Sequence, residues 1–138
     1  MVHRVGIIGL GTVGSRFVEQ FNNHGAFELA AAWDADPEAC SLHAGSVNIC
    51  SGADEVIAAS DLVYVAVPPK HHRDYVLSCI AAQTAIFCEK PLGIDLVSSR
   101  ELVDAVERSD LPAGVNFVFS AAPSARELQY KVMNGELG

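Results

Sequence analysis

Apolar residues along this chain fall into two kinds of segment: short unbroken runs, and longer stretches with apolar positions at helical spacing. The short runs are rich in β-branched residues, which is typical of strands buried on both faces of a parallel sheet. They predict six strands, at residues 2–10, 27–33, 47–50, 62–67, 85–88 and 113–119. Because helical segments separate the strands, we expect an α/β fold with a doubly wound, mainly parallel sheet in the order 3-2-1-4-5-6.

The helical segments carry their own start signals. Asp36 followed by Pro37 predicts an N-cap and a first helical residue, and Asp95 predicts the cap of a later helix. Helices are expected at residues 12–24, 37–43, 54–60, 71–82, after residue 95, and at 124–134. In the helix after Asp95, five residues predict one apolar face: Leu96, Val97, Leu102, Val103 and Val106.

A glycine-rich turn, Gly9-Leu10-Gly11-Thr12-Val13-Gly14, joins the first predicted strand to the first predicted helix. Asp34 follows Gly14 by twenty residues, at the end of the second strand. A glycine pattern alone is weak evidence, but strand, turn, helix, strand and terminal acid together are typical of a dinucleotide site. Gly9 would permit the tight turn, Gly11 the approach of a pyrophosphate, and Gly14 close packing of helix on strand. The N–H groups at the start of the helix would face the phosphates.

The acid at the end of the second strand bears on the choice of cofactor. Asp34 would accept hydrogen bonds from the adenosine ribose hydroxyls and would repel the 2′-phosphate of NADP. The next residues, Ala35-Asp36-Pro37, offer no Arg or Lys to hold that phosphate. NAD is therefore the predicted cofactor, ahead of NADP.

Composition narrows the class of protein. A chain of 138 residues, half of them hydrophobic and 19% charged, is expected to form about one globular domain. The net charge of −8, with no basic stripe, argues against nucleic-acid binding. The apolar runs are too short for a membrane span, and the first strand follows Met1 too closely to leave room for a signal peptide.

The four cysteines do not form a recognisable ligand pattern. Cys40, Cys50, Cys79 and Cys88 include no C-x-x-C pair, and no histidine spacing suggests zinc, so no metal site is predicted. We expect reduced, mostly buried thiols in a cytoplasmic protein, with disulfides as the less favoured alternative.

A charged pair, Glu89-Lys90, followed by Pro91, comes directly after the fifth predicted strand. The carboxyl ends of the strands face the cofactor crevice in folds of this class. Lys90 could hold a substrate hydroxyl and manage its proton while hydride moves to a nicotinamide. The alternative is an ordinary solvated pair ahead of a turn-making proline, and spacing alone leaves both interpretations open.

Taken together, these motifs resemble the N-terminal NAD(P)-binding Rossmann domain of the Gfo/Idh/MocA oxidoreductases. The resemblance rests on the glycine turn, Val67-Pro68-Pro69-Lys70-His71-His72, Cys88-Glu89-Lys90-Pro91-Leu92 and the closing Gly135-Glu136-Leu137-Gly138. It implies that Lys90 is the catalytic lysine that contacts the substrate hydroxyl, and that Glu89 helps to place the nicotinamide ribose. It also implies a Lys90–Pro91 bond that is often cis.

The resemblance extends to the turn after the fourth predicted strand. His72 matches a family histidine near the nicotinamide end of the cofactor, so Val67, Pro68 and His72 are predicted cofactor contacts. Relatives carry a Thr-Pro-Asn type of turn where this chain has Val67-Pro68-Pro69, and an Arg where it has Ser120-Ala121-Ala122. His71 is expected to be a water-exposed residue at the start of a helix.

The resemblance also implies a division of the chain. Residues 1–120 would form the Rossmann domain, and residues 121–138 a connecting helix that leads into a C-terminal substrate domain absent from this sequence. A chain lacking that domain should expose apolar surface and tend to self-associate, so a homo-oligomer is possible.

These features support one leading function and two alternatives. The leading hypothesis is the cofactor-binding half of an NAD-dependent oxidoreductase acting on a hydroxyl carbon of a sugar, polyol or related small molecule. A non-catalytic module that senses NAD or serves as an assembly subunit is the first alternative. Another Rossmann dehydrogenase, such as one acting on an amino acid, is the second, but it explains Glu89-Lys90-Pro91 less well.

Overall fold

The computed structural model describes residues 1–136, whose centre is a five-stranded parallel sheet. The strand order is β2-β1-β3-β4-β5. The strands are β1 (His3–Ile8), β2 (Phe27–Trp33), β3 (Leu62–Val65), β4 (Ala85–Glu89) and β5 (Ala113–Asn116). The expected doubly wound α/β fold is thereby confirmed.

The predicted strand at residues 47–50 is reduced to one bridge. Ile49 pairs in parallel with Ala32, on the outer side of β2, where the predicted order places that strand. The segment is too short to pair further, because Ser51 and Gly52 lead directly into the next helix. The sixth predicted strand is also shorter than expected: β5 ends at Asn116 and a 3₁₀ turn begins at Val118.

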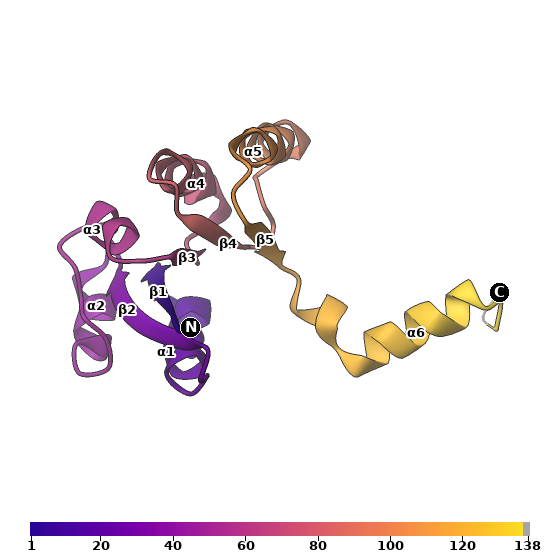
Figure 1. Ribbon diagram of the computed structural model, residues 1–138, viewed down its shortest axis with the longest axis horizontal. Coiled ribbons are helices and arrows are strands. Elements are labelled where there is room, and N and C mark those ends of the chain that lie inside the picture. Colours follow the sequence, from indigo (N-terminus) through magenta and orange to yellow (C-terminus); the bar gives the residue numbers. More distant parts are fainter. Residues whose placement is uncertain (137–138) are drawn as a thin grey trace.

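Helices connect the strands and cover both faces of the sheet (Figure 1). They are α1 (Thr12–Asn22), α2 (Pro37–His43), α3 (Ala53–Ala58), α4 (His72–Ala81), α5 (Leu96–Ser109) and α6 (Pro123–Met133), with 3₁₀ turns η1 (Pro69–His71) and η2 (Val118–Ala121). Both predicted caps are confirmed. The Asp36 side chain accepts the Glu38 N–H at the start of α2, and Asp95 accepts the Ser98 N–H at the start of α5.

Each face of the sheet has its own hydrophobic core. On the first face, α1 packs through Val18 and Phe21 against Val5, Ile7 and Tyr64 of the strands. On the second, buried residues of α3, α4 and α5, including Val56, Val76 and Leu102, cover the opposite side chains of β3 and β4. Both sides of the central strands are thus buried, as their unbroken apolar runs predicted.

The prediction of one apolar face on α5 is wrong for the first turn of this helix. Leu102 is buried and Val106 packs against the core, but Leu96 and Val97 are 80% and 68% exposed, and Val103 is 38% exposed. Val97 and Leu102 are five residues apart, which places them about 140° apart around a helix. One helix face cannot bury both of them.

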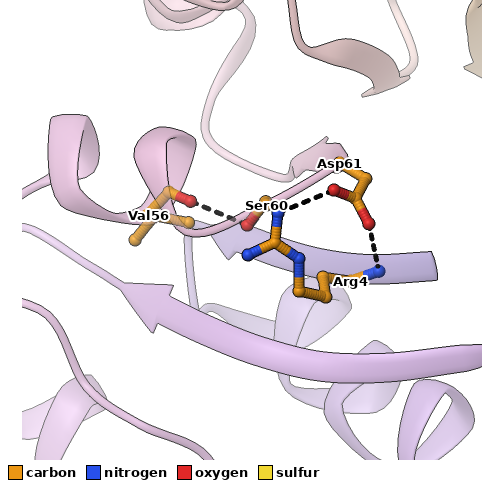
Figure 2. A network of polar contacts seen from close by, with 4 residues as sticks. All are labelled: Arg4, Val56, Ser60 and Asp61. Carbon is orange, nitrogen blue, oxygen red and sulfur yellow. Dashed lines mark hydrogen bonds and ion pairs between the residues drawn. The ribbon is translucent and has the colours of Figure 1, made fainter. Parts of the chain in front are cut away.

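The segment between α3 and β3 is tied to β1 (Figure 2). Asp61 accepts the backbone N–H of Arg4 at 2.9 Å and its guanidinium at 2.8 Å, and the Ser60 hydroxyl donates to the Val56 carbonyl. A Cβ on Gly6 of β1 would overlap Ser60. The absence of a side chain at Gly6 therefore lets α3 approach the sheet.

The helix α6 projects from the end of the sheet (Figure 1). Exposed apolar side chains mark η2, the residue before it, and α6: Phe117, Val118, Phe119, Leu128, Val132 and Met133. An open apolar groove of about 530 Å³ lies between α1 and the starts of β3, β4 and β5. The division at residue 120 stays a prediction, and Leu137 and Gly138 of the closing motif lie outside the described residues.

Two further expectations concern cysteines and membranes. All four cysteines, which lie within the described residues, are free thiols; Cys79 and Cys88 are buried, whereas Cys40 and Cys50 are partly exposed. Burial raises the pKa of the Cys79 and Cys88 thiols to about 12. Within residues 1–136, no helix is long and apolar enough to cross a membrane.

Candidate functional site

The three glycines of the first turn meet three different environments. Gly9 has a φ of +101°, and a Cβ there would lie 2.7 Å from the backbone of Ala66. A Cβ on Gly14 would overlap the carbonyl oxygen of Gly9. A Cβ on Gly11 would meet no atom within 4 Å, so this position faces open space. The turn therefore has no room for a side chain at Gly9 or Gly14, whereas it is open to the outside at Gly11.

The residues between these glycines build the start of α1. Leu10 is buried, and its carbonyl accepts the hydroxyl of Ser15 at 2.7 Å. Thr12 is exposed and Val13 is 38% exposed in the first turn of α1. Gly11, the N-cap, provides no side-chain acceptor for that turn. The N-terminal N–H groups are thus available to an anion.

Asp34 links this turn to the loop after β2. Its carboxylate accepts the N–H of Leu10 at 2.6 Å and the N–H of Asp36 at 2.8 Å. The two bonds fix the carboxylate at the carboxyl edge of the sheet, and each carboxylate oxygen keeps a further acceptor site.

A cleft of about 450 Å³ opens along this edge. It brings together five of the predicted site residues: Gly9, Gly11, Asp34, Val67 and Pro68. Its other lining residues are Trp33, Ala35, Asp36, Ala39, Ala66, Lys70, His71 and Tyr75. The other predicted residues do not line it: Leu10, Thr12, Val13, Gly14, His72, Glu89 and Lys90.

Lys70 and His71 were missed as site residues. Both are exposed at η1, directly after β3 and its prolines, and both line the cleft. His71 is exposed as expected, but it is also a cleft residue. Their position just beyond the carboxyl end of a buried strand was the signal that could have identified them.

His72 lies inside the protein. Its side chain is fully buried, with Nε2 at 2.8 Å from the Val67 carbonyl and Nδ1 at 3.1 Å from the Leu92 carbonyl. The ring therefore joins the loop after β3 to the loop after β4. This arrangement favours a role in holding the two loops over direct contact with a ligand.

Glu89 ends β4 within a buried polar cluster that sequence reasoning did not find. Its Oε1 accepts hydrogen bonds from the Tyr64 hydroxyl and the Asn116 amide, and its Oε2 accepts the N–H of Lys90 at 3.1 Å. The Asn116 amide also donates to the Tyr64 oxygen at 3.2 Å. Burial, together with the bond to Glu89, raises the pKa of the Tyr64 hydroxyl far above its usual range.

Lys90 differs from its neighbour in being exposed. Its peptide bond to Pro91 is cis, the geometry that the resemblance implied. Glu89 is thus anchored below the surface of the edge while the Lys90 side chain is accessible above it. Among residues 1–136, no group of three or more His, Cys, Asp or Glu side chains is placed to hold a metal ion.

The parallel sheet, the glycine turn open at Gly11 and the carboxylate of Asp34 define a Rossmann dinucleotide-binding domain. Residues 3–117 match the oxidoreductase family with an NAD-binding Rossmann fold, Gfo/Idh/MocA. The chain belongs to this family.

Several inositol dehydrogenases are among its relatives. Inositol 2-dehydrogenase of Cereibacter sphaeroides (strain ATCC 17023) is 40% identical over 113 residues, which are 78% of this chain and 34% of that protein. Inositol 2-dehydrogenase of Corynebacterium glutamicum (strain R) is 31% identical over 98% of this chain and 42% of its own length.

A solved structure supports the fold over the whole chain. Scyllo-inositol dehydrogenase from Lactobacillus casei, with bound NAD(H) and scyllo-inositol, superposes with a TM-score of 0.91 at 22% identity. The superposition covers 100% of this chain and 43% of that one. The chain thus spans well under half the length of these relatives, and the region it matches is their cofactor-binding portion.

Proposed function

We propose that this chain is the NAD-binding portion of an oxidoreductase that transfers hydride between a nicotinamide and a hydroxyl carbon of a small polyol or sugar. The observation that carries the proposal is the cleft in which Gly9, Gly11 and Asp34 meet. The position of Gly11 leaves room for a pyrophosphate, and Asp34 supplies the acceptor for ribose hydroxyls.

Charge in the cleft supports NAD over NADP. Asp34 and Asp36 line the cleft, and their carboxylates disfavour a 2′-phosphate there. Lys70 brings one ammonium group to the same cleft, but the two carboxylates outnumber it. The charges in the cleft therefore suit NAD better than NADP.

The predicted site residues take different roles in this proposal, and that of the buried His72 is to hold together the loops after β3 and β4. The turn from Gly9 to Gly14 and the start of α1 would bind the pyrophosphate, and Val67 and Pro68 would form the opposite wall of the cleft. The bound nicotinamide would supply the hydride acceptor. Lys90, exposed at the end of β4, would hold the substrate hydroxyl and move its proton, while Glu89 would position the nicotinamide ribose.

The relatives suggest the substrate class. Those from Cereibacter and Corynebacterium are inositol 2-dehydrogenases, and another, 26% identical, from Bacillus subtilis (strain 168) is a glucose-6-phosphate 3-dehydrogenase. All three names describe enzymes that act on a ring carrying several hydroxyl groups. A ring polyol or sugar is therefore the substrate we assign.

The exposed apolar surface of the chain bears on its connection to a further domain and on its association with other copies. We infer that residues 121–138 form a connection to a substrate-binding domain, because α6 projects from the sheet with apolar side chains exposed. The same apolar surface would also support a homo-oligomer. Free thiols at all four cysteines favour a reducing compartment, the cytoplasm.

A non-catalytic NAD-binding module is the alternative function. It is favoured by one observation: Lys90 does not line the cleft in which Gly9, Gly11 and Asp34 meet. In that case the cleft would bind NAD, and Lys90 would have no chemical role.

A calorimetric titration of the chain with NAD and NADP in one buffer tests the proposed cofactor. Saturable binding with NAD preferred is the expected result. The absence of binding to either nucleotide would overturn the proposal, and a preference for NADP would overturn the choice of cofactor.

The role of Lys90 needs a two-domain enzyme. This chain would replace the matching portion of the Cereibacter inositol 2-dehydrogenase, with and without Lys90→Ala. Arg100→Ala, which removes an exposed cation of α5 outside the cleft, is the control. We expect Lys90→Ala to lower kcat at least about a hundredfold with little change in the Kd for NAD. Equal turnover in Lys90→Ala and the parent would remove Lys90 from the mechanism, and a parent chimera that binds NAD without turnover would favour the non-catalytic alternative.

A further inference from the structure

The carboxylate of Glu89 is buried without a cation. The side chain is 7% exposed, and the three groups that contact its oxygens are the Tyr64 hydroxyl, the Asn116 amide and the Lys90 N–H. All three are neutral donors. The ion pairs formed within residues 1–136 involve other carboxylates, those of Asp61, Glu101 and Glu127.

This set of partners fits a negative charge. An ionised carboxylate only accepts hydrogen bonds, and each of the three contacts is a donor aimed at it. Hydrogen bonds offset part of the free-energy cost of moving a charge out of water, but they supply no opposite charge. A cation that arrives beside Glu89 would therefore be attracted in a site of low dielectric.

The sheet order places this charge at a defined distance from Asp34. Asp34 follows the end of β2, and Glu89 ends β4; β1 and β3 lie between them in the order β2-β1-β3-β4. Three strand spacings separate β2 from β4, about 14 Å along the carboxyl edge. A dinucleotide with its adenosine ribose at Asp34 and its pyrophosphate at Gly11 would extend across β1 and β3 toward β4. Its nicotinamide end would then approach Glu89.

The two redox forms of the cofactor differ in charge at that end. The nicotinamide ring of NAD⁺ is a cation, whereas that of NADH is neutral. We propose that Tyr64 and Asn116 are positioning residues that hold the Glu89 carboxylate beside the nicotinamide, and that this fixed charge selects the oxidised cofactor over the reduced one. The inference rests on the proposed function, since it requires a dinucleotide in the cleft.

Binding measurements on the 138-residue chain separate the two proposals. The ligands are NAD⁺, NADH and ADP-ribose, which lacks the nicotinamide, and the variants are Glu89→Gln and the control Glu101→Gln on the exposed surface of α5. We expect Glu89→Gln to lower the affinity for NAD⁺ relative to NADH by roughly tenfold. ADP-ribose affinity should stay unchanged, and Glu101→Gln should leave all three affinities at wild-type values.

Tyr64→Phe tests the positioning role and replaces Glu89→Gln if that variant does not fold. It removes one donor to the carboxylate, and the ratio of NAD⁺ to NADH affinity should fall in the same direction by a smaller factor. Tyr130→Phe on α6 is the control, because its side chain is 65% exposed. A purely structural effect would weaken NAD⁺, NADH and ADP-ribose together and leave the ratio unchanged.

The outcomes are distinct. An unchanged ratio in Glu89→Gln, or in Tyr64→Phe if Glu89→Gln does not fold, overturns this inference while the proposed function stands. If the wild-type chain binds none of the three ligands, the proposed function fails and this inference fails with it.

Discussion

Three glycines within six residues have separable tasks, because a side chain would meet different atoms at each of them. A Cβ at Gly14 overlaps the Gly9 carbonyl, whereas a Cβ at Gly11 meets nothing within 4 Å. Gly14 is thus required by the protein itself. Gly11 is required only if a ligand approaches the turn.

Alanine at Gly14 should lower stability, whereas alanine at Gly11 should weaken NAD binding. Gly14→Ala should destabilise the fold by about 2 kcal/mol or more through overpacking, measured as a shift in the denaturant midpoint. Gly11→Ala should unfold at the wild-type midpoint and bind NAD at least about tenfold more weakly, because the new methyl group occupies the approach of the pyrophosphate. Wild-type NAD affinity in Gly11→Ala would show that no phosphate contacts this turn.

Asp34 should control the choice of cofactor. We expect Asp34→Asn, which keeps an acceptor for the Leu10 N–H, to narrow the preference for NAD over NADP by about tenfold. Calorimetric titration with both cofactors measures the ratio, and Asp54→Asn, on α3 and outside the cleft, is the control. A ratio that does not change would mean that Asp34 does not face the ribose.

The sequence indicated which residues lie together where the signal was local, whereas their roles in binding stay predictions. Gly9, Gly11 and Asp34 were recognisable because strand, turn and terminal acid lie within one short unit, and they do meet in the cleft. Tyr64 and Asn116 were not recognisable as partners of Glu89. They lie 25 and 27 residues from it along the chain, and only the pairing of β3, β4 and β5 brings them together.

At the scale of secondary-structure elements, α5 depends on its cap. Asp95 accepts the Ser98 N–H at 2.7 Å, and the Ser98 hydroxyl lies 3.1 Å from the Asp95 N–H in return. The backbone bond and then the hydroxyl of Ser98 hold the pKa of Asp95 below its usual value. Because the folded pKa is depressed, this contribution to stability is present above the usual Asp pKa and is lost as pH falls through the folded value.

A comparison of two cap variants tests this pH dependence. Asp95→Ala should lower the melting temperature by a few degrees at about pH 7, and the difference from wild type should shrink at about pH 3. Asp95→Asn keeps a capping acceptor without the titrating group, so it should lie closer to wild type at both pH values. A difference between Asp95→Ala and wild type that is the same at both values would contradict the account of the cap.

The helices and strands were predicted best where local signals, such as a capping residue, determine them. Asp36, Pro37 and Asp95 mark helix starts by local chemistry, and the structure confirms them. The strand at residues 47–50 and the buried first turn of α5 were overestimated. Ile49 and Val97 are apolar, but whether they are paired or buried depends on neighbours that the local pattern does not contain.

At the scale of the whole molecule, the uncovered apolar surface is the dominant feature. Side chains of η2 and α6, among them Phe119, Leu128 and Val132, are exposed, and an apolar groove opens beside α1. Exposed apolar side chains in such number promote association.

We therefore expect the chain to self-associate with increasing concentration, as measured by sedimentation equilibrium. Leu128→Lys should shift it toward monomer, because it places a charge within the apolar side chains of α6. Gln129→Lys adds the same charge at a polar position of the same helix and should have less effect. A chain that stays monomeric at the highest concentration would show that this surface does not associate.

The central claim is that the cleft at the carboxyl edge of the sheet binds NAD. The most direct test is an NMR titration of the ¹⁵N-labelled chain with NAD, followed by amide chemical shifts. The account predicts the largest changes at residues 9–14, Asp34 and residues 66–71, with smaller ones at Glu89 and Lys90. No saturable change, or changes confined to the groove around Phe17 and Phe87, would contradict it.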